Sequence, residues 1–75
     1  MVNPGPRRLE KRSLTLARHS TSLALEPEFW DVLESFAARR GQSLAMLVAS
    51  IDVERGERPL ASACRVAALE YACLR

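Results

Sequence analysis

The sequence predicts a small, mainly α-helical domain that begins with a short β-ribbon. Residues 19–26 alternate large apolar and small side chains, which is the periodicity of a β-strand. Three later segments, residues 27–40, 43–55 and 59–74, repeat apolar side chains at helical spacing. The chain has 75 residues, which limits it to one small domain.

The strand at residues 19–26 needs a backbone partner. Its alternation places Thr21, Leu23 and Leu25 on one face. An isolated strand leaves its backbone groups unpaired, so either an upstream segment or a second copy of the chain must pair with it. The opposite face carries only small side chains: Ser20, Ser22 and Ala24.

Residues 11–16 are the upstream candidate for that partner. Leu14 and Leu16 alternate with small polar residues, as in a second strand. Residues 17–20 would then form the loop of a hairpin. This loop lacks the Asn-Gly or Gly that favours a tight turn, so a hairpin is possible, but we expect Thr21–Leu25 to pair with a second copy of the chain.

The first helix is expected over residues 27–40. Pro27 suits the first helical position, where its missing N–H costs nothing, and Gly41 is a natural stop. Its apolar stripe holds every Phe and Trp of the chain and is expected to form the core: Phe29, Trp30, Leu33, Phe36 and Ala37, with Val32 beside them.

Two further helices follow after short connections. Ser43 is a good N-cap for the second, which ends near Gly56, and the third runs from about Pro59 to Leu74. The second helix carries Leu44, Leu47, Val48 and Ile51 on one face. The third is apolar over much of its girth, which favours burial of part of it in a contact between chains. Its two apolar edges are Leu60, Cys64, Ala67, Ala68 and Tyr71, and Ala63, Val66 and Leu69.

A chain of this size needs a further source of stability, and we expect a two-fold homodimer. Cys64 and Cys73 lie nine residues apart on one helix, about 900° of rotation and 13 Å of rise, which excludes a disulfide between them. One His and two separated Cys do not form a zinc site, so we expect no metal and no cofactor. With neither signal peptide nor membrane span in the sequence, we expect a cytoplasmic protein that is not in a membrane.

The charge is unevenly distributed along the chain. Residues 1–20 contain five Lys or Arg against one acidic residue, whereas residues 21–75 contain six Arg against eight acidic residues. Residues 1–10 contain Pro4-Gly5-Pro6 and no periodicity, so we expect a disordered basic arm ahead of a domain at residues 11–75. A basic arm on a mildly acidic body suits a polyanionic partner, although a solvated leader would have the same composition.

The order of these elements resembles the ribbon-helix-helix proteins, the class of the Arc and methionine repressors. The resemblance is closest to a bacterial subfamily of small ribbon-helix-helix domain proteins, and it covers about residues 11–75. The stretches that carry it are Lys11–Leu16, His19–Trp30, Arg40–Leu44, Leu47–Asp52, Ser62–Val66 and Leu69–Tyr71.

This resemblance implies an intertwined homodimer whose strands pair antiparallel and enter the DNA major groove, with the third helix added at the C-terminus. The implied base-reading positions are Ser20, Ser22 and Ala24. Phosphate would bind to the start of the second helix and to basic groups beside the ribbon. The residues for these phosphate contacts are Ser43, Leu44, Ala45, Arg12, Arg18 and His19.

One departure from that class affects the function. Base-reading ribbons use Arg, Lys, Asn or Gln, but this face offers two serines and an alanine. If residues 12–16 add outer strands, the dimer ribbon spans about 14 Å of backbone, wider than a major groove of about 12 Å. From the resemblance, we expect a DNA-binding regulator or antitoxin-like component. The alternative is a dimer that binds a protein partner and no DNA. No nucleophile and base are arranged for catalysis, so we do not expect an enzyme.

Overall fold

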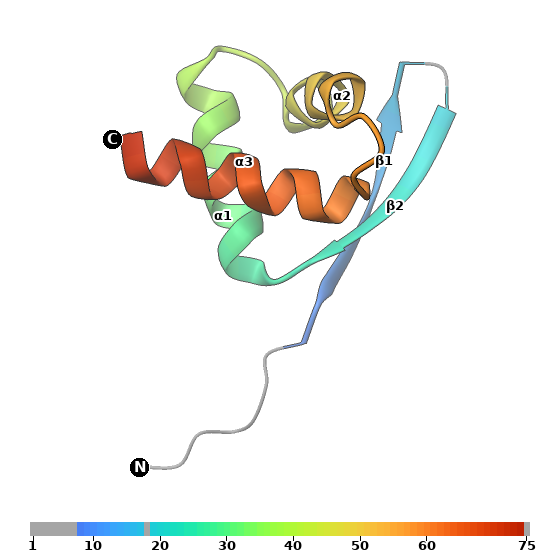
Figure 1. The fold of residues 1–75 in the computed structure, drawn as a ribbon, viewed down its shortest axis with the longest axis horizontal. Helices are drawn as coiled ribbons and strands as arrows, with labels where there is room; N and C mark the ends of the chain where they lie inside the picture. The colour runs from blue at the N-terminus through green and yellow to red at the C-terminus, as the bar shows by residue number, and fades with distance from the viewer. Residues whose placement is uncertain (1–7, 18, 75) are drawn as a thin grey trace.

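A computed structural model describes residues 8–17 and 19–74 of the chain. It contains a β-hairpin followed by three helices, as Figure 1 shows. In chain order the elements are β1 (Glu10–Leu16), β2 (His19–Leu25), α1 (Pro27–Arg39), α2 (Leu44–Glu54) and α3 (Leu60–Leu74). The predicted fold class, mainly helical with a short ribbon and a third helix, is confirmed. The disorder predicted for residues 1–10 falls mostly on residues 1–7, which lie outside the described residues, and Glu10 already belongs to β1.

The strand at residues 19–25 finds its partner within the same chain. β1 and β2 pair antiparallel, with Ser13 opposite Ser22 at the middle of the ladder. The hairpin that the sequence left possible is therefore observed, and the pairing of Thr21–Leu25 with a second copy stays a prediction. The hairpin loop is two residues shorter than predicted, and Ala17 at its start has a left-handed backbone with φ of 52°.

The hairpin has one covered face and one open face. Leu16, Leu23 and Leu25 point to the helices and are at most 4% exposed. The side chains between them along each strand point away and are exposed or half-buried. This is the two-residue period of a strand that lies against a core on one side only. The facing predicted for Thr21–Leu25 is confirmed.

α1 begins at the predicted residue and ends at Arg39, one residue before the predicted end. Pro27 occupies the first turn, and the amides of Phe29 and Trp30 both donate to the carbonyl of Glu26. At the other end, the amide of Gln42 donates to Ala37 at 3.0 Å across Gly41, whose φ is 67°. A left-handed glycine in this position satisfies the last carbonyls of a helix.

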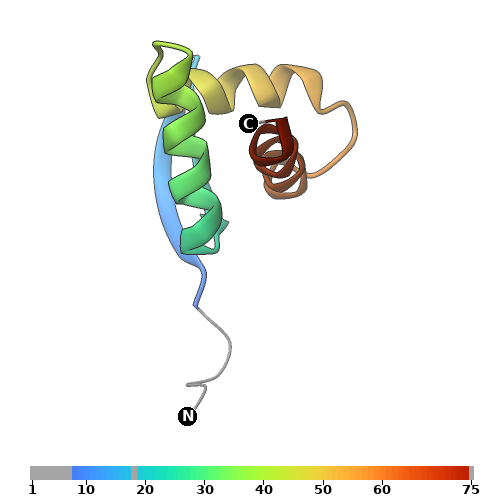
Figure 2. The same cartoon turned by 90° about the vertical axis from the view of Figure 1, so that its left-hand side faces the viewer.

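α2 and α3 follow through equally short connections. The hydroxyl of Ser43 accepts the amide of Met46 at 3.1 Å, which is the predicted N-cap of α2. Gly56, with φ of 63°, lies in the turn before α3. In Figure 2, α1 runs alongside the hairpin, α2 extends across its end, and α3 is viewed along its axis.

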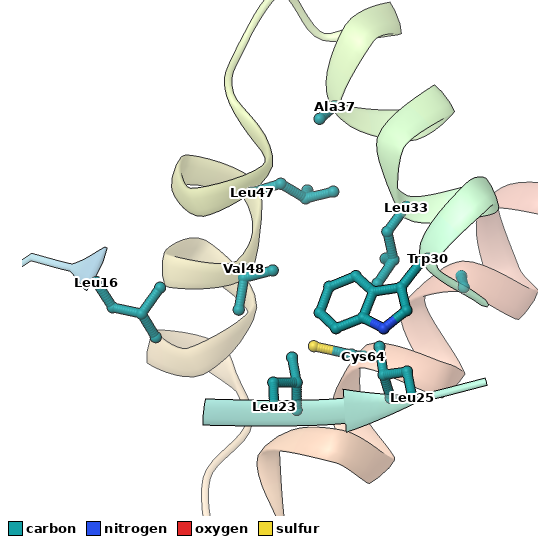
Figure 3. Packing of buried hydrophobic residues seen from close by; sticks show 10 residues of the cluster. Leu16, Leu23, Leu25, Trp30, Leu33, Ala37, Leu47, Val48 and Cys64 are labelled. Carbon is teal, nitrogen blue, oxygen red and sulfur yellow. The ribbon is translucent and has the colours of Figure 1, made fainter. Parts of the chain in front are cut away.

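The core lies between the hairpin and the three helices. In Figure 3, Trp30 occupies its centre, with Cys64 of α3 and the β2 leucines around the indole. Trp30, Leu33 and Val48 are fully buried within this single chain. The other aromatic side chains predicted for the core, Phe29 and Phe36, pack against its edge and are half-buried. The buried cluster comprises Leu16, Leu23, Leu25, Trp30, Leu33, Ala37, Leu47, Val48, Cys64 and Ala68.

Candidate nucleic-acid interface

The open side of the hairpin brings together the residues that, according to the resemblance, would read DNA bases. We call it the outer face. Its side chains form three cross-strand pairs, and only one of the six is charged at neutral pH. The pairs are Lys11 with Ala24, Ser13 with Ser22, and Thr15 with Ser20. Cross-strand neighbours on one face have Cβ atoms about 4.5–5.5 Å apart, so the four hydroxyls form one compact patch.

The predicted reading positions lie together on this face. Ser20 and Ser22 are exposed, and Ala24 is half-buried. His19 is exposed too, but it pairs with Leu16, whose side chain points to the core. By strand alternation, His19 therefore belongs to the covered side of the hairpin and lies at its end. Arg18 lies outside the described residues.

Arg12 points to the helices and not to the outer face. Its Nε donates to Glu10 at 2.8 Å, its Nη1 donates to Glu34 at 2.5 Å, and its guanidinium lies 4.7 Å from the centroid of the Trp30 ring. The hydrogen bonds that Arg12 donates to Glu34 and Glu10 raise the pKa of Arg12 above its ordinary value. The DNA contact expected of Arg12 stays a prediction, and its cation already has two carboxylate partners.

The same cluster anchors β1 to α1. The indole N–H of Trp30 donates to the backbone carbonyl of Glu10 at 2.8 Å. This hydrogen bond joins residues twenty positions apart, so no local pattern in the sequence indicates it. Together with Arg12 and Glu34 it fixes the N-terminal end of β1 over the first helix.

The start of α2 is the predicted phosphate site. Ser43 is exposed and uses its oxygen to accept the Met46 amide, which leaves its hydroxyl proton able to donate. Leu44 and Ala45 supply the first amides of the helix, where the positive end of the helix dipole lies. Their side chains are half-buried, so only their backbone could contact an anion.

Two arginines that the sequence analysis left unassigned precede this helix start. Arg39 and Arg40 are exposed at the end of α1. The guanidinium of Arg40 lies 5.6 Å from the centroid of the Phe36 ring. Tyr71 stacks on the same Phe36 ring. Their position four and three residues before Ser43 is a local signal that could have identified them.

The sequence and the fold of this chain are similar to those of known proteins. A family model described as "Ribbon-helix-helix domain" matches residues 9–72. The chain belongs to the ribbon-helix-helix family. Such domains are typically non-enzymatic DNA-binding modules of regulators.

A solved structure supports the same fold for this ribbon-helix-helix protein. The chain is similar to an uncharacterized protein from Bordetella pertussis Tohama I, with 38% sequence identity and a TM-score of 0.78. The match covers 97% of this chain but 62% of that chain, so this ribbon-helix-helix protein spans less than two thirds of the length of its neighbour. No curated protein sequence matches it significantly.

Within the described residues, this ribbon-helix-helix protein has no cluster of three or more His, Cys, Asp or Glu side chains that could bind a metal ion. None of its described helices combines the length and apolarity that a membrane span requires. Two of its concavities lie beside α2 and α3, and both are lined by Ile51, Glu54, Ala67 and Glu70.

Proposed function

We propose that this chain is a homodimeric DNA-binding regulator that contacts DNA mainly through the phosphate backbone. The observation that carries the proposal is its membership of the ribbon-helix-helix family, together with an outer face that the three helices leave open. The dimer, the DNA contact and the regulatory role are parts of this proposal.

The second edge of β2 is the surface that suits dimerisation. β1 occupies one edge of β2, and within the described residues no strand pairs with the other. Antiparallel pairing of this edge with its copy around a two-fold axis would give a four-stranded sheet with β1 on each outside. Such pairing would also satisfy the backbone groups of β2 that β1 leaves unpaired.

The width of that sheet determines how it would meet DNA. Four strands span about 14 Å of backbone, whereas the major groove is about 12 Å wide. The sheet would therefore lie across the groove, with Ser20 and Ser22 of the central strands above the base edges. Ser13, Thr15 and Lys11 of the outer strands would face the phosphates. Because hydroxyls and one ammonium form few bidentate contacts with bases, this arrangement predicts weak sequence preference.

The charge distribution supports a phosphate-directed contact. Lys11 is exposed on the outer face, and the sequence places further arginines ahead of β1 and in the hairpin loop. The first turn of α2, with Ser43 and the nearby Arg39, would add a second phosphate contact at each end of the dimer. Neutralised phosphates release counterions, so binding of this kind weakens steeply with salt.

Gel retardation with two duplexes of unrelated sequence tests the proposal. We expect both duplexes to bind at low salt, and a fourfold rise in salt to weaken binding about 10²-fold, as for roughly four phosphate contacts. Lys11→Glu should weaken binding at least about tenfold by placing a negative charge on the outer face. Arg58→Glu is the matched control, because Arg58 is exposed in the α2–α3 connection, which Figure 2 shows far from the hairpin. Absence of retardation at low salt, or equal loss in both variants, would refute the phosphate contact.

A second candidate function is a dimeric module that binds a protein and no DNA. It is favoured by β1, which widens the ribbon beyond the groove, and by the absence of Arg, Lys, Asn and Gln at positions 20, 22 and 24. This alternative predicts a stable dimer in sedimentation without any DNA retardation. The two measurements together therefore separate it from the DNA-binding function.

A further inference from the structure

α3 has two apolar faces, and only one of them packs within the chain. Cys64 and Ala68 are fully buried against the core, and Tyr71 stacks on Phe36 of α1 with ring centroids 4.6 Å apart. At 100° per residue, these side chains occupy one side of the helix. The sequence predicts that the broad apolar surface of α3 favours a contact between chains. Within this chain, the fully buried side chains of α3 are Cys64 and Ala68.

The opposite side of α3 carries a second apolar stripe that faces solvent. Val66 is 36% and Leu69 is 62% exposed, and Cys73 is exposed as well. With Ser62 they lie about 180° from the buried side. Figure 1 shows this helix in front of α1, with no element covering its near side. We call Ser62, Val66, Leu69 and Cys73 the outer stripe.

The spacing of the outer stripe is that of a coiled-coil seam. The steps of four, three and four residues place Ser62 and Leu69, and likewise Val66 and Cys73, seven residues apart as in a heptad repeat. Val66 and Cys73 are then at a positions and Ser62 and Leu69 at d positions. Among parallel coiled coils, a β-branched residue at a with leucine at d favours two strands over three or four. A helix that only contacts its own core needs no such seam on its solvent side.

The charges beside the stripe are complementary in a parallel pair. Arg65 is at the g position and Glu70 is at the e position five residues later, which is the spacing of interhelical g–e ion pairs. Arg65 holds Glu26 through Nε at 3.0 Å, and its guanidinium has further N–H groups on Nη1 and Nη2. It could therefore keep Glu26 while donating to Glu70 of a second copy.

We propose that the outer stripe of α3 binds the outer stripe of a second copy of the chain as a parallel helix pair. The two-fold axis would run along α3 between the two helices, with Val66, Leu69 and Cys73 each facing their own counterpart. This contact is separate from the strand pairing of the proposed function and does not depend on it. A chain that used both contacts would assemble beyond a dimer.

Sedimentation equilibrium over about a hundredfold concentration range tests the contact. Leu69→Glu places two buried negative charges at the seam, so the expected result is one fewer doubling of mass and at least about a 30-fold weaker association. Leu74→Glu is the matched control, because Leu74 is 86% exposed and lies outside the stripe. If the chain does not also dimerise through β2, Leu69→Glu should convert a dimer into a monomer. If it does dimerise through β2, Leu69→Glu should convert a tetramer into a dimer. Equal behaviour of both variants and the parent chain would overturn the proposal.

Crosslinking through Cys73 tests the parallel orientation. Treatment with diamide, which takes up the two electrons and two protons that two thiols lose, should link Cys73 to its counterpart and give a covalent dimer on a non-reducing gel. Cys64 is buried and cannot contribute. Cys73→Ser should abolish the dimer, and Leu69→Glu should reduce it at least about fivefold while Leu74→Glu leaves it unchanged. Failure of the parent chain to crosslink, or equal yields from both glutamate variants, would overturn the parallel pair.

Discussion

At the scale of single residues, Arg12 makes contacts with β1 and α1 that no local sequence pattern indicates. It sits in a strand, binds two carboxylates and lies over Trp30. A lysine could keep the charge but not this arrangement, because an ammonium lacks the planar fork that binds two acceptors and stacks on a ring. This set of contacts with two carboxylates and the Trp30 ring is therefore specific to arginine, and it holds β1 against α1.

Replacing Arg12 should expose that specificity. Arg12→Ala is expected to lower the free energy of unfolding by about 1 kcal/mol, which combines a partly exposed ion pair with a cation–π contact. Arg12→Lys should recover less than half of the loss. Urea denaturation measures both, and Lys11→Ala on the outer face should change stability by less than about 0.5 kcal/mol. An Arg12→Lys variant as stable as the parent chain would contradict the stacked geometry.

Glu26 predicts a pH dependence of stability. Its hydrogen bond from Arg65, and then one from its own backbone amide, lower its pKa below the ordinary value of 4.5. A lowered pKa means that the stabilisation is complete above the unfolded value and is lost as the pH falls through the folded one. Glu26→Gln should therefore be less stable than the parent chain at pH 7, and the difference should shrink towards pH 3.

A double-mutant cycle between Glu26→Gln and Arg65→Gln isolates that pair. Urea denaturation of the four chains at pH 7 and pH 3 should give a coupling energy that is smaller at the lower pH than at the higher one. A coupling that is equal at both pH values would show that the carboxylate charge does not carry the interaction.

At the scale of elements, the N-cap of α2 is the feature most open to a direct test. Ser43→Ala removes the acceptor of the Met46 amide, and we expect a loss of about 1 kcal/mol in the free energy of unfolding. Ser50→Ala is a matched control within the same helix, because the Ser50 hydroxyl only donates to the Leu47 carbonyl at 2.8 Å. It should cost less than about 0.5 kcal/mol in thermal or urea unfolding. Equal losses from both serines would argue against the capping role.

The helices could be predicted from the sequence because each is bounded by local chemistry: Pro27 and Gly41 for α1, Ser43 and Gly56 for α2. The hairpin could not be chosen over pairing between chains, since the loop lacks glycine. Ala17 takes up the left-handed backbone there with φ of 52°, and the hydrogen bond that ties β1 to α1 comes from Trp30, far along the chain.

Part of the candidate site could also be predicted from the sequence, and part could not. The two-residue period of a strand sufficed to place Ser20, Ser22 and Ala24 on one face. The same period places Arg12 on the face of Leu14 and Leu16, but it did not indicate its partner Glu34, twenty-two residues later. The dimer and the DNA contact remain predictions.

At the scale of the whole molecule, the core closes within one chain. β1 pairs with β2, and α3 covers Trp30 and the β2 leucines, so the most buried side chains need no second copy to exclude water. Dimerisation would then add an interface to a domain that already has its own core.

The two cysteines report on that closure. Burial, and then the charge of Asp52, raise the pKa of Cys64 to about 11, whereas Cys73 is exposed. A disulfide-exchange reagent should therefore label one thiol of the native chain quickly and the second only as the chain unfolds. Cys73→Ser should abolish the fast reaction. Two fast thiols would show that the core is open around Cys64.

Within the described residues no strand pairs with the second edge of β2, and this edge also bears on solubility. An unpaired seven-residue strand edge is a template onto which any extended chain can add, and proteins usually guard such edges with lysines, prolines or bulges. β1 carries Lys11 and Arg12, but β2 carries no Lys, Arg or Pro. When this chain is diluted away from its strand partner or partly unfolded, aggregation should therefore start at β2, and pairing of two such edges would remove the template.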